Sequence, residues 1–401
     1  MASRRTVLVW AACLSGTTLL VVLVGALVPG TLPDLMVYRV GGHAWLDGIP
    51  LYTTEFPYRL PFTYPPVAAV LFSVLGVLPW AAAIAALSVA GLLALSLTTM
   101  LVAPAHRRMA FAAVAAGLGL ALEPVRDTLM LGQVNLILMG LVAFDCLAPR
   151  TRYPRGMLIG LAAAVKLTPA IFVLYFLAKR RYAAAGTATA TFAGVSALGF
   201  AVAPTDSIRY WTTALFDADR IGGAAFATNQ SLRAALVRFD LDPAVTQACW
   251  LALAAVVLVL AWLGARRADR MVALLVVVTA GLLVSPVSWS HHWVWIVPAV
   301  VVAGVRVARS GNRRQAALLG ALVVVFVAGQ RFLPHADDRE LAWTWWQHVL
   351  GNNYLLVGLA FLVWSVVRKP APVVLTVPAH PTPPAGAHSS VSGSPIRTIP
   401  G

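Results

Sequence analysis

Apolar runs of up to about 20 residues recur along the chain, separated by short polar and charged stretches. A helix needs roughly 20 apolar residues to cross the hydrocarbon core of a bilayer, so each run predicts a membrane-spanning helix. The expected spans are 7–29, 81–103, 109–123, 129–148, 183–203, 245–264, 271–286, 292–309, 315–331 and 350–367. The pattern therefore predicts an all-α polytopic membrane protein.

Two further segments do not fit a simple crossing. Segment 66–79 is short, and segment 156–178 carries Lys166 and Pro169 near its middle. Interrupted helices are tolerated in a membrane where they line a cavity inside the protein. We therefore expect re-entrant, broken or interfacial helices here, in a fold of about 10–12 transmembrane helices in all.

Composition supports this class and excludes others. Hydrophobic residues make up 60% of the 401 residues and charged residues only 11%, and the mean hydropathy is +0.80. A soluble domain of this size does not bury so large an apolar fraction. The net charge of +15 comes from short basic clusters between apolar runs, which is typical of membrane topology and not of a nucleic-acid partner.

The basic clusters predict the orientation. With the N-terminus inside and 156–178 as a hairpin, 20 of the 30 Lys and Arg residues face the cytoplasm. Of the 15 Asp and Glu residues, only Asp145 and Asp269 lie at or near that face. Making 66–79 and 156–178 true spans would instead export Arg107 and Arg108. The first topology predicts a multi-pass plasma-membrane protein with extracytoplasmic chemistry in the long loops 30–65, 204–244 and 332–349.

Two domains are expected. Residues 1–369 form the multi-spanning catalytic domain. Residues 370–401 are rich in Pro, Ser and Gly, a composition typical of disordered chain, and they predict a disordered cytoplasmic tail.

Asp34 is the first candidate for chemistry. It lies a few residues beyond the first expected span, so a rigid helix holds it near the outer membrane interface. A carboxylate there can act as a general base toward a hydroxyl group on a lipid-anchored acceptor. The alternative is a structural role as the cap of a helix that begins near Leu35.

A second candidate site follows the 271–286 span. His291 and His292 can donate to phosphate oxygens, and Trp289 can stack on a sugar ring. Tryptophans at a membrane boundary are common in membrane proteins, but that explanation does not account for the adjacent histidines.

Polar residues in and beside two other apolar segments complete the set. Gln133, Asn135 and Arg126 suit sugar hydroxyls and a phosphate, although helix capping and interhelical hydrogen bonds explain them as well. Lys166 is a cation inside an apolar segment, which favours binding of a lipid phosphate, with snorkelling to the interface as the alternative.

Two short D-x-D strings, Asp217–Asp219 and Asp240–Asp242, can in principle hold a divalent metal ion on a sugar diphosphate. A three-residue pattern arises often by chance and does not by itself predict a metal site. Sequence motifs of soluble nucleotide-binding and hydrolase folds are absent.

Taken together, these strings resemble glycosyltransferase family 87, in the family's order, from about residue 30 to residue 300. The residues that carry the resemblance are Asp34 with Tyr38, 48–52, 62–66, 132–135, 166–169, 229–232 and 285–293. Asp34 matches the family's base position, and the pair His291–His292 matches its second essential region.

The resemblance implies a GT-C fold and an actinobacterial-type mannosyltransferase. The implied donor is polyprenyl-phosphate-mannose, and the implied acceptor is a glycolipid, either a phosphatidylinositol mannoside or lipomannan and lipoarabinomannan. The implied reaction is one inverting displacement that forms an α-1,2 linkage without metal or other cofactor. Residues expected to bind donor or acceptor are Tyr38, Arg39, Tyr64, Arg126, Gln133, Asn135, Lys166, Asn229, Gln230 and Trp289. The enzyme is expected to act as a monomer.

Two alternatives remain open. Another GT-C transferase could move arabinose or glucose from a polyprenyl phosphate, because sugar choice depends on a few hydroxyl contacts. A lipid or solute transporter would also contain broken helices, but its charged residues should lie near the membrane midplane. The carboxylates of this chain are instead expected on one outer face.

Overall fold

The computed structural model describes residues 3–52 and 60–368, apart from the side chains of residues 218, 219 and 328. Within these residues the chain is almost entirely helical, and the only β-type pairing is a bridge between Asn229 and Trp289. The expected all-α fold is thus confirmed. Residues 1–368 form one compact unit; the expected tail 370–401 lies outside the described residues.

Five described helical segments are long and apolar enough to cross a bilayer. They are α1 (Arg4–Leu27), α4 (Trp80–Val102), α10 (Tyr182–Val202), α13 (Pro243–Arg267) and Ser290–Ser310, which contains a 3₁₀ turn followed by α15 (Ile296–Ser310). Each lies within a few residues of an expected span. Many of their leucine and valine side chains are exposed, as contact with lipid requires.

Two further crossings are bent. The segment Ala105–Ala121, which includes α5 (Arg108–Leu118), meets α6 (Glu123–Leu131) at 79°, and α17 (Trp345–Gly351) meets α18 (Asn353–Val367) at 69°. Counting each bent pair as one crossing raises the number among the described residues to seven. The first bend falls at the end of the expected span 109–123, and the second falls near the start of the expected span 350–367.

The remaining helices are short. They are α2 (Pro33–Leu46), α3 (Pro66–Val77), α7 (Asn135–Leu147), α8 (Met157–Val165), α9 (Phe172–Ala178), α11 (Pro204–Arg209), α12 (Leu232–Val237), α14 (Arg270–Val284) and α16 (Arg313–Ala328). The expected span 129–148 is broken at Gly132, between α6 and α7. Segment 156–178 is broken between α8 and a 3₁₀ turn, Thr168–Ile171, as Lys166 and Pro169 predicted.

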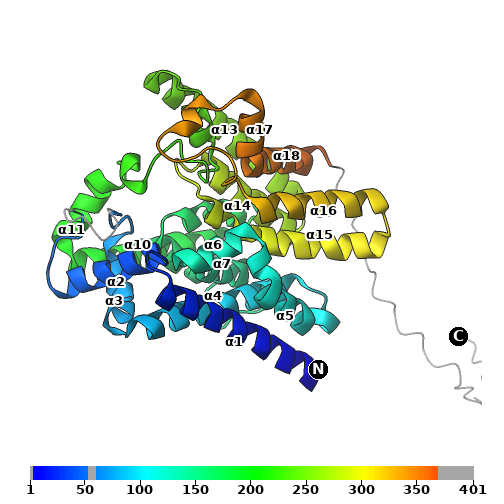
Figure 1. The fold of residues 1–401 in the computed structure, drawn as a ribbon, viewed down its shortest axis with the longest axis horizontal. Helices are drawn as coiled ribbons and strands as arrows, with labels where there is room; N and C mark the ends of the chain where they lie inside the picture. The colour runs from blue at the N-terminus through cyan, green and yellow to red at the C-terminus, as the bar shows by residue number, and fades with distance from the viewer. Residues whose placement is uncertain (1–2, 53–59, 369–401) are drawn as a thin grey trace, which may run out of the picture. The chain divides into compact units, whose positions relative to one another are not determined.

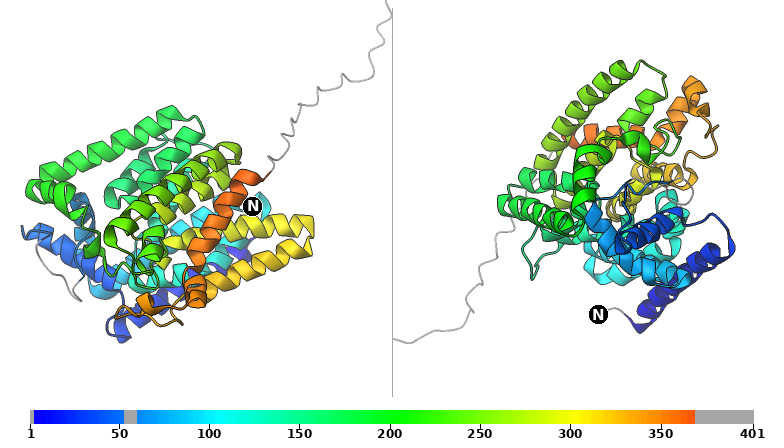
Figure 2. Two further views of the ribbon diagram at one scale, coloured as in Figure 1. Left: turned by 90° about the horizontal axis from the view of Figure 1, so that it is seen from above. Right: turned by 90° about the vertical axis from the view of Figure 1, so that its left-hand side faces the viewer.

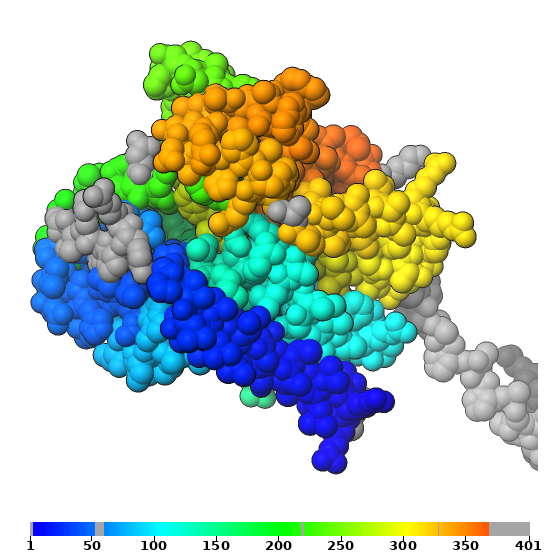
Figure 3. Space-filling model, in the orientation of Figure 1, coloured from blue at the N-terminus to red at the C-terminus, as the bar shows by residue number. Residues whose placement is uncertain are grey.

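The helix ends sort into two sides of this unit. In Figure 1 the start of α1, the turn between α15 and α16 and the end of α18 lie toward the right, whereas α2 and α11 lie at the left. The view from above in Figure 2 keeps this order. Figure 3 shows α1 as a ridge along one outer face. The described basic clusters at the ends of α1, α15, α16 and α18 therefore share one side, as the predicted topology requires.

Candidate active site

Asp34 lies in the first turn of α2. Leu32 is the N-cap, with a left-handed backbone (φ 60°), and its N–H donates to the carbonyl of Met130 at 3.0 Å. Pro33 is the first helical residue, a position where proline suits the helix. Because Leu32 holds the capping position, the capping role considered for Asp34 does not apply.

Gly132 brings Asp34 to its neighbours. Its φ of +72° favours glycine, and a Cβ atom there would lie only 2.6 Å from Cβ of Leu35. Only glycine thus lets the break between α6 and α7 lie against the first turn of α2. This close approach places Asp34 beside Gln133.

Tyrosines from α2 and the segment before α3 hold the Gln133 amide in place. The Tyr38 hydroxyl donates to Oε1 of Gln133 at 2.8 Å and lies 2.9 Å from the hydroxyl of Tyr64. The Tyr38 ring stacks on Phe72, with 4.2 Å between centroids, and the Tyr52 hydroxyl donates to the Tyr64 carbonyl at 2.6 Å. The segments of the expected first outer loop that resemble the family, which include Tyr38, Tyr52 and Tyr64, thus contact one another.

Lys166 lies where α8 ends, in extended backbone after Val165. Its Nζ is 3.0 Å from Oδ1 of Asn135, 3.4 Å from Oε1 of Gln133 and 3.3 Å from Nε2 of His292. It also lies over the Tyr64 ring, 5.6 Å from the centroid. The helix break therefore directs the Lys166 ammonium inward, onto polar residues from three other segments.

A cavity of about 340 Å³ lies beside these residues, although Tyr38 and Asn135 are not part of its lining. Its polar lining includes Asp34, Tyr64, Gln133, Lys166, Arg220, Trp289 and His292, and apolar residues such as Val37, Leu215 and Val287 complete the wall. A mostly apolar pocket with a few convergent polar groups is the usual form of a ligand site.

The cavity changes the acidity of Asp34. Burial raises the pKa of its carboxyl from 3.8 to about 6, while the positive charge of Lys166 and the hydrogen bond to Gln133 oppose the rise. Asp34 is therefore ionised at neutral pH but a stronger base than an exposed aspartate, which suits proton abstraction from a hydroxyl group.

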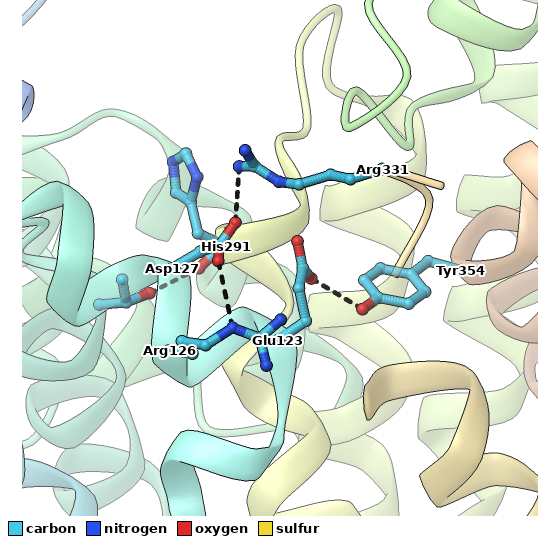
Figure 4. A network of polar contacts seen from close by, with 7 residues as sticks. Glu123, Arg126, Asp127, His291, Arg331 and Tyr354 are labelled. Atoms are coloured by element: carbon cyan, nitrogen blue, oxygen red, sulfur yellow. Dashed lines mark hydrogen bonds and ion pairs between the residues drawn. The ribbon is translucent and has the colours of Figure 1, made fainter. Parts of the chain in front are cut away.

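The two adjacent histidines have different surroundings. His292 lines the cavity and contacts Lys166. The His291 carbonyl accepts hydrogen bonds from Oγ1 of Thr128 at 3.0 Å and Nδ2 of Asn135 at 3.1 Å, while its ring lies near Arg331 in Figure 4. His292 is thus the histidine that can reach a molecule in the cavity.

The polar cluster behind His291 ties α6 to the C-terminal helices. Arg331 donates to Asp127 at 2.7 Å, Arg126 lies 3.8 Å from the same carboxylate, and the Tyr354 hydroxyl donates to Glu123 at 2.8 Å (Figure 4). Arg126 is not among the residues that line the 340 Å³ cavity.

Asn229 and Gln230 are fully buried and bond to the main chain. Oδ1 of Asn229 accepts from the Ser288 N–H at 2.9 Å, and Gln230 Nε2 donates to the Gly351 carbonyl at 2.7 Å. The backbone of residues 228–230 also pairs with that of residues 288–290. This arrangement favours a positioning role, in which the amides hold Trp289 at the cavity wall.

Arg39 and the described side chains of the D-x-D strings lie outside the cavity lining. Arg39 donates to the carbonyls of Leu75 and Leu78, at 2.7 and 2.6 Å, and stacks on Trp80. Arg39 therefore binds carbonyl groups at the C-terminal end of α3 and does not line the cavity. In the D-x-D strings, Asp242 caps α13 by accepting from the N–H groups of residues 244 and 245, and the side chain of Asp219 is not described.

Arg220 is a cavity residue that sequence reasoning missed. Its Nη1 donates to the Tyr52 carbonyl at 3.1 Å, and its side chain lines the cavity with Asp34 and Lys166. It is one of the few basic residues on the expected outer side. The scarcity of basic residues there could have marked Arg220 as a candidate in the sequence. A guanidinium here suits a phosphate group.

The chain matches the model of glycosyltransferase family 87 over residues 62–286. It is 40% identical to the "polyprenol-phosphate-mannose-dependent alpha-(1-2)-phosphatidylinositol mannoside mannosyltransferase" of Mycobacterium tuberculosis over 87% of this chain and 86% of that one. It is 36% identical to the corresponding "pentamannoside mannosyltransferase" of Mycolicibacterium smegmatis, over 84% and 85%.

Among solved structures, it matches ArnT from Cupriavidus metallidurans bound to undecaprenyl phosphate, at 16% identity, a TM-score of 0.34 and coverage of 89% of this chain and 77% of that one. So distant a match carries no argument about the site. The family assignment rests on the sequence relatives and the family model, and by both measures the chain belongs to glycosyltransferase family 87.

Proposed function

We propose that this enzyme transfers mannose from polyprenol-phosphate-mannose to a phosphatidylinositol mannoside and forms an α-1,2 linkage. The names of the two relatives at 40% and 38% identity support both substrates. The relatives named for the pentamannoside are less similar, at 36% and 35% identity. This order favours a phosphatidylinositol mannoside other than the pentamannoside as the acceptor.

The observation that carries the mechanism is the presence of a carboxylate base and cations in one cavity. Asp34 accepts the proton of an acceptor hydroxyl while that oxygen attacks the anomeric carbon of mannose. The bond between this carbon and the phosphate oxygen breaks in the same step, and polyprenyl phosphate leaves. The product is inverted relative to the donor, so a β-linked donor gives an α-linked product.

Lys166 and Arg220 hold the phosphate group and stabilise its growing negative charge, with His292 beside them. The three protons of the Lys166 ammonium face Asn135, Gln133 and His292, so a bound phosphate replaces at least one of these acceptors. Trp289 forms a wall on which a sugar ring can stack. A donor that carries only one phosphate on a lipid needs no nucleotide-binding domain.

The reaction takes place on the extracytoplasmic side of the plasma membrane, and one chain contains the whole cavity. Two observations support this orientation: the basic helix ends share one side, and α2, which carries Asp34, lies on the other (Figure 1). The positive-inside rule assigns the basic side to the cytoplasm. The acceptor glycolipid and the donor lipid then reach the cavity from the outer leaflet.

The donor is tested with purified full-length enzyme, a phosphatidylinositol mannoside acceptor and radiolabelled sugars. Mannose transfer from polyprenyl-phosphate-mannose, with none from GDP-mannose, supports the proposal. Transfer only from polyprenyl-phosphate-arabinose or polyprenyl-phosphate-glucose would leave the fold assignment intact but show that the donor sugar is not mannose. A parallel reaction with the phosphatidylinositol pentamannoside as acceptor tests which of the two acceptors named for the relatives this enzyme uses.

A further inference from the structure

A second cavity lies at the opposite end of the helices from Asp34. It has a volume of about 340 Å³ and lies between the end of α4, the end of α7, the start of α14 and the last turns of α15. The proposed transfer reaction makes no use of it. Its position among the basic helix ends places it on the side that the proposed topology assigns to the cytoplasm.

The lining combines three arginines with an apolar wall. The arginines are Arg270, Arg306 and Arg309, and the wall is built from Leu101, Val102, Ala103, Pro104, Leu147, Met271, Val302 and Val305. A free anion would use only the arginines. A molecule with a negative headgroup and an attached hydrocarbon chain would use both parts.

The charge around this cavity is positive after its internal pairs are counted. Arg306 donates to Asp269 at 3.0 Å, and Arg270 donates to the carbonyl of Cys146. The Asp269 carboxylate therefore faces the three arginines, and it offsets one of their three positive charges. In the described part of the chain, the Arg309 side chain makes no hydrogen bond or ion pair, so its guanidinium has its full capacity for a ligand.

We propose that this cavity binds an anionic membrane phospholipid, with the phosphate at Arg306 and Arg309 and the first part of an acyl chain against the apolar wall. Basic pockets between transmembrane helices on the cytoplasmic side commonly bind such headgroups. The bound lipid fills the space between four helix ends and holds α15 against α4. It therefore stabilises the enzyme without entering the active site.

Native mass spectrometry of the purified full-length enzyme tests the proposal. Palmitoyl-oleoyl-phosphatidylglycerol is titrated against wild type and the double variant Arg306→Gln/Arg309→Gln, with palmitoyl-oleoyl-phosphatidylcholine as the neutral lipid. Each arginine near an anionic lipid contributes about 1 kcal/mol, or about a fivefold change in affinity. The double variant should thus bind phosphatidylglycerol about 25-fold more weakly, with phosphatidylcholine binding unchanged.

Two controls separate this site from general charge effects. Arg313→Gln/Arg314→Gln removes the same charge at the start of α16, outside the cavity lining, and should retain phosphatidylglycerol affinity within about twofold. Arg309→Gln alone leaves the pair between Arg306 and Asp269 intact and should still lose about fivefold.

Equal weakening in both double variants would overturn the proposal, as would unchanged binding in Arg306→Gln/Arg309→Gln. Inorganic phosphate at the same concentration should not displace the lipid; displacement would show a simple anion site instead. These measurements contain no sugar donor, so their result is independent of the transferase assay.

Discussion

The Lys166 ammonium lies 3.3 Å from Nε2 of His292, although 126 positions separate the two residues in the sequence. A protonated lysine donates, so Nε2 accepts and the ring proton of His292 is on Nδ1. The helix break after Val165 and the turn before α15 both direct these side chains into the cavity that contains Asp34. The proposed base, Asp34, and the proposed phosphate-binding residue, Lys166, therefore line one cavity.

Replacement of Lys166 should impair the departure of the phosphate. We expect Lys166→Met to lower kcat/KM for polyprenyl-phosphate-mannose about 10²- to 10³-fold, as the loss of a transition-state charge partner typically does. Steady-state kinetics with purified protein measure this, and Lys166→Arg is the matched variant that retains the charge. A loss as large in Lys166→Arg as in Lys166→Met would show that the cationic charge is not the essential property.

The two histidines should differ in their effects. His292→Ala removes a side chain that lines the cavity, so we expect kcat to fall at least tenfold. His291→Ala leaves the carbonyl that binds Thr128 and Asn135 in place, and should have the smaller effect on kcat. Comparison of kcat for the two variants measures this. A larger loss in His291→Ala would assign the catalytic contact to the other ring.

The activity should follow the ionisation of Asp34. A general base must be unprotonated, and the pKa of Asp34 is about 6. Activity should therefore be high at neutral pH, be half-maximal near pH 6 and fall about tenfold per pH unit below it. The measurement is the pH profile of kcat/KM, and enzyme returned to neutral pH serves as the control for unfolding. A flat profile between about pH 5 and 7 would contradict the role of Asp34 as base.

Loss of Asn229 should affect stability more than donor binding. Asn229→Ala leaves the buried N–H of Ser288 without its acceptor, which costs about 1–3 kcal/mol. We expect a lower Tm and a lower yield of active enzyme, with KM for the donor nearly unchanged in the folded fraction. An increase in KM at unchanged Tm would instead support the direct donor contact considered from the sequence.

The sequence predicted the fold class and much of the cavity for identifiable reasons. Long apolar runs predict helices because the bilayer allows little else, and Lys166 with Pro169 predicted the break that the structure contains. Asp34, Gln133 and His292 stood out because each lies at the expected outer boundary of a span. These three residues line the same cavity.

Other features depend on packing that a linear pattern does not contain. The break at Gly132 was missed, although Gln133 and Asn135 follow it, because it depends on a close approach to Leu35 in another helix. Asn229 looked like a ligand-binding amide, but its partner is a main-chain N–H 59 positions away. Arg220 belongs to no recognisable motif, and only folding of the outer loops brings it to the cavity.

The most direct test of the mechanism compares Asp34→Asn with wild type in mannose transfer from polyprenyl-phosphate-mannose. Asp47→Asn, at the exposed end of the same helix, is the matched control. Asn is similar in size to Asp but cannot accept the proton, so kcat should fall about 10²- to 10⁴-fold in Asp34→Asn and remain near wild type in Asp47→Asn. Full activity in Asp34→Asn, with the fold intact, would contradict the assignment of Asp34 as the general base.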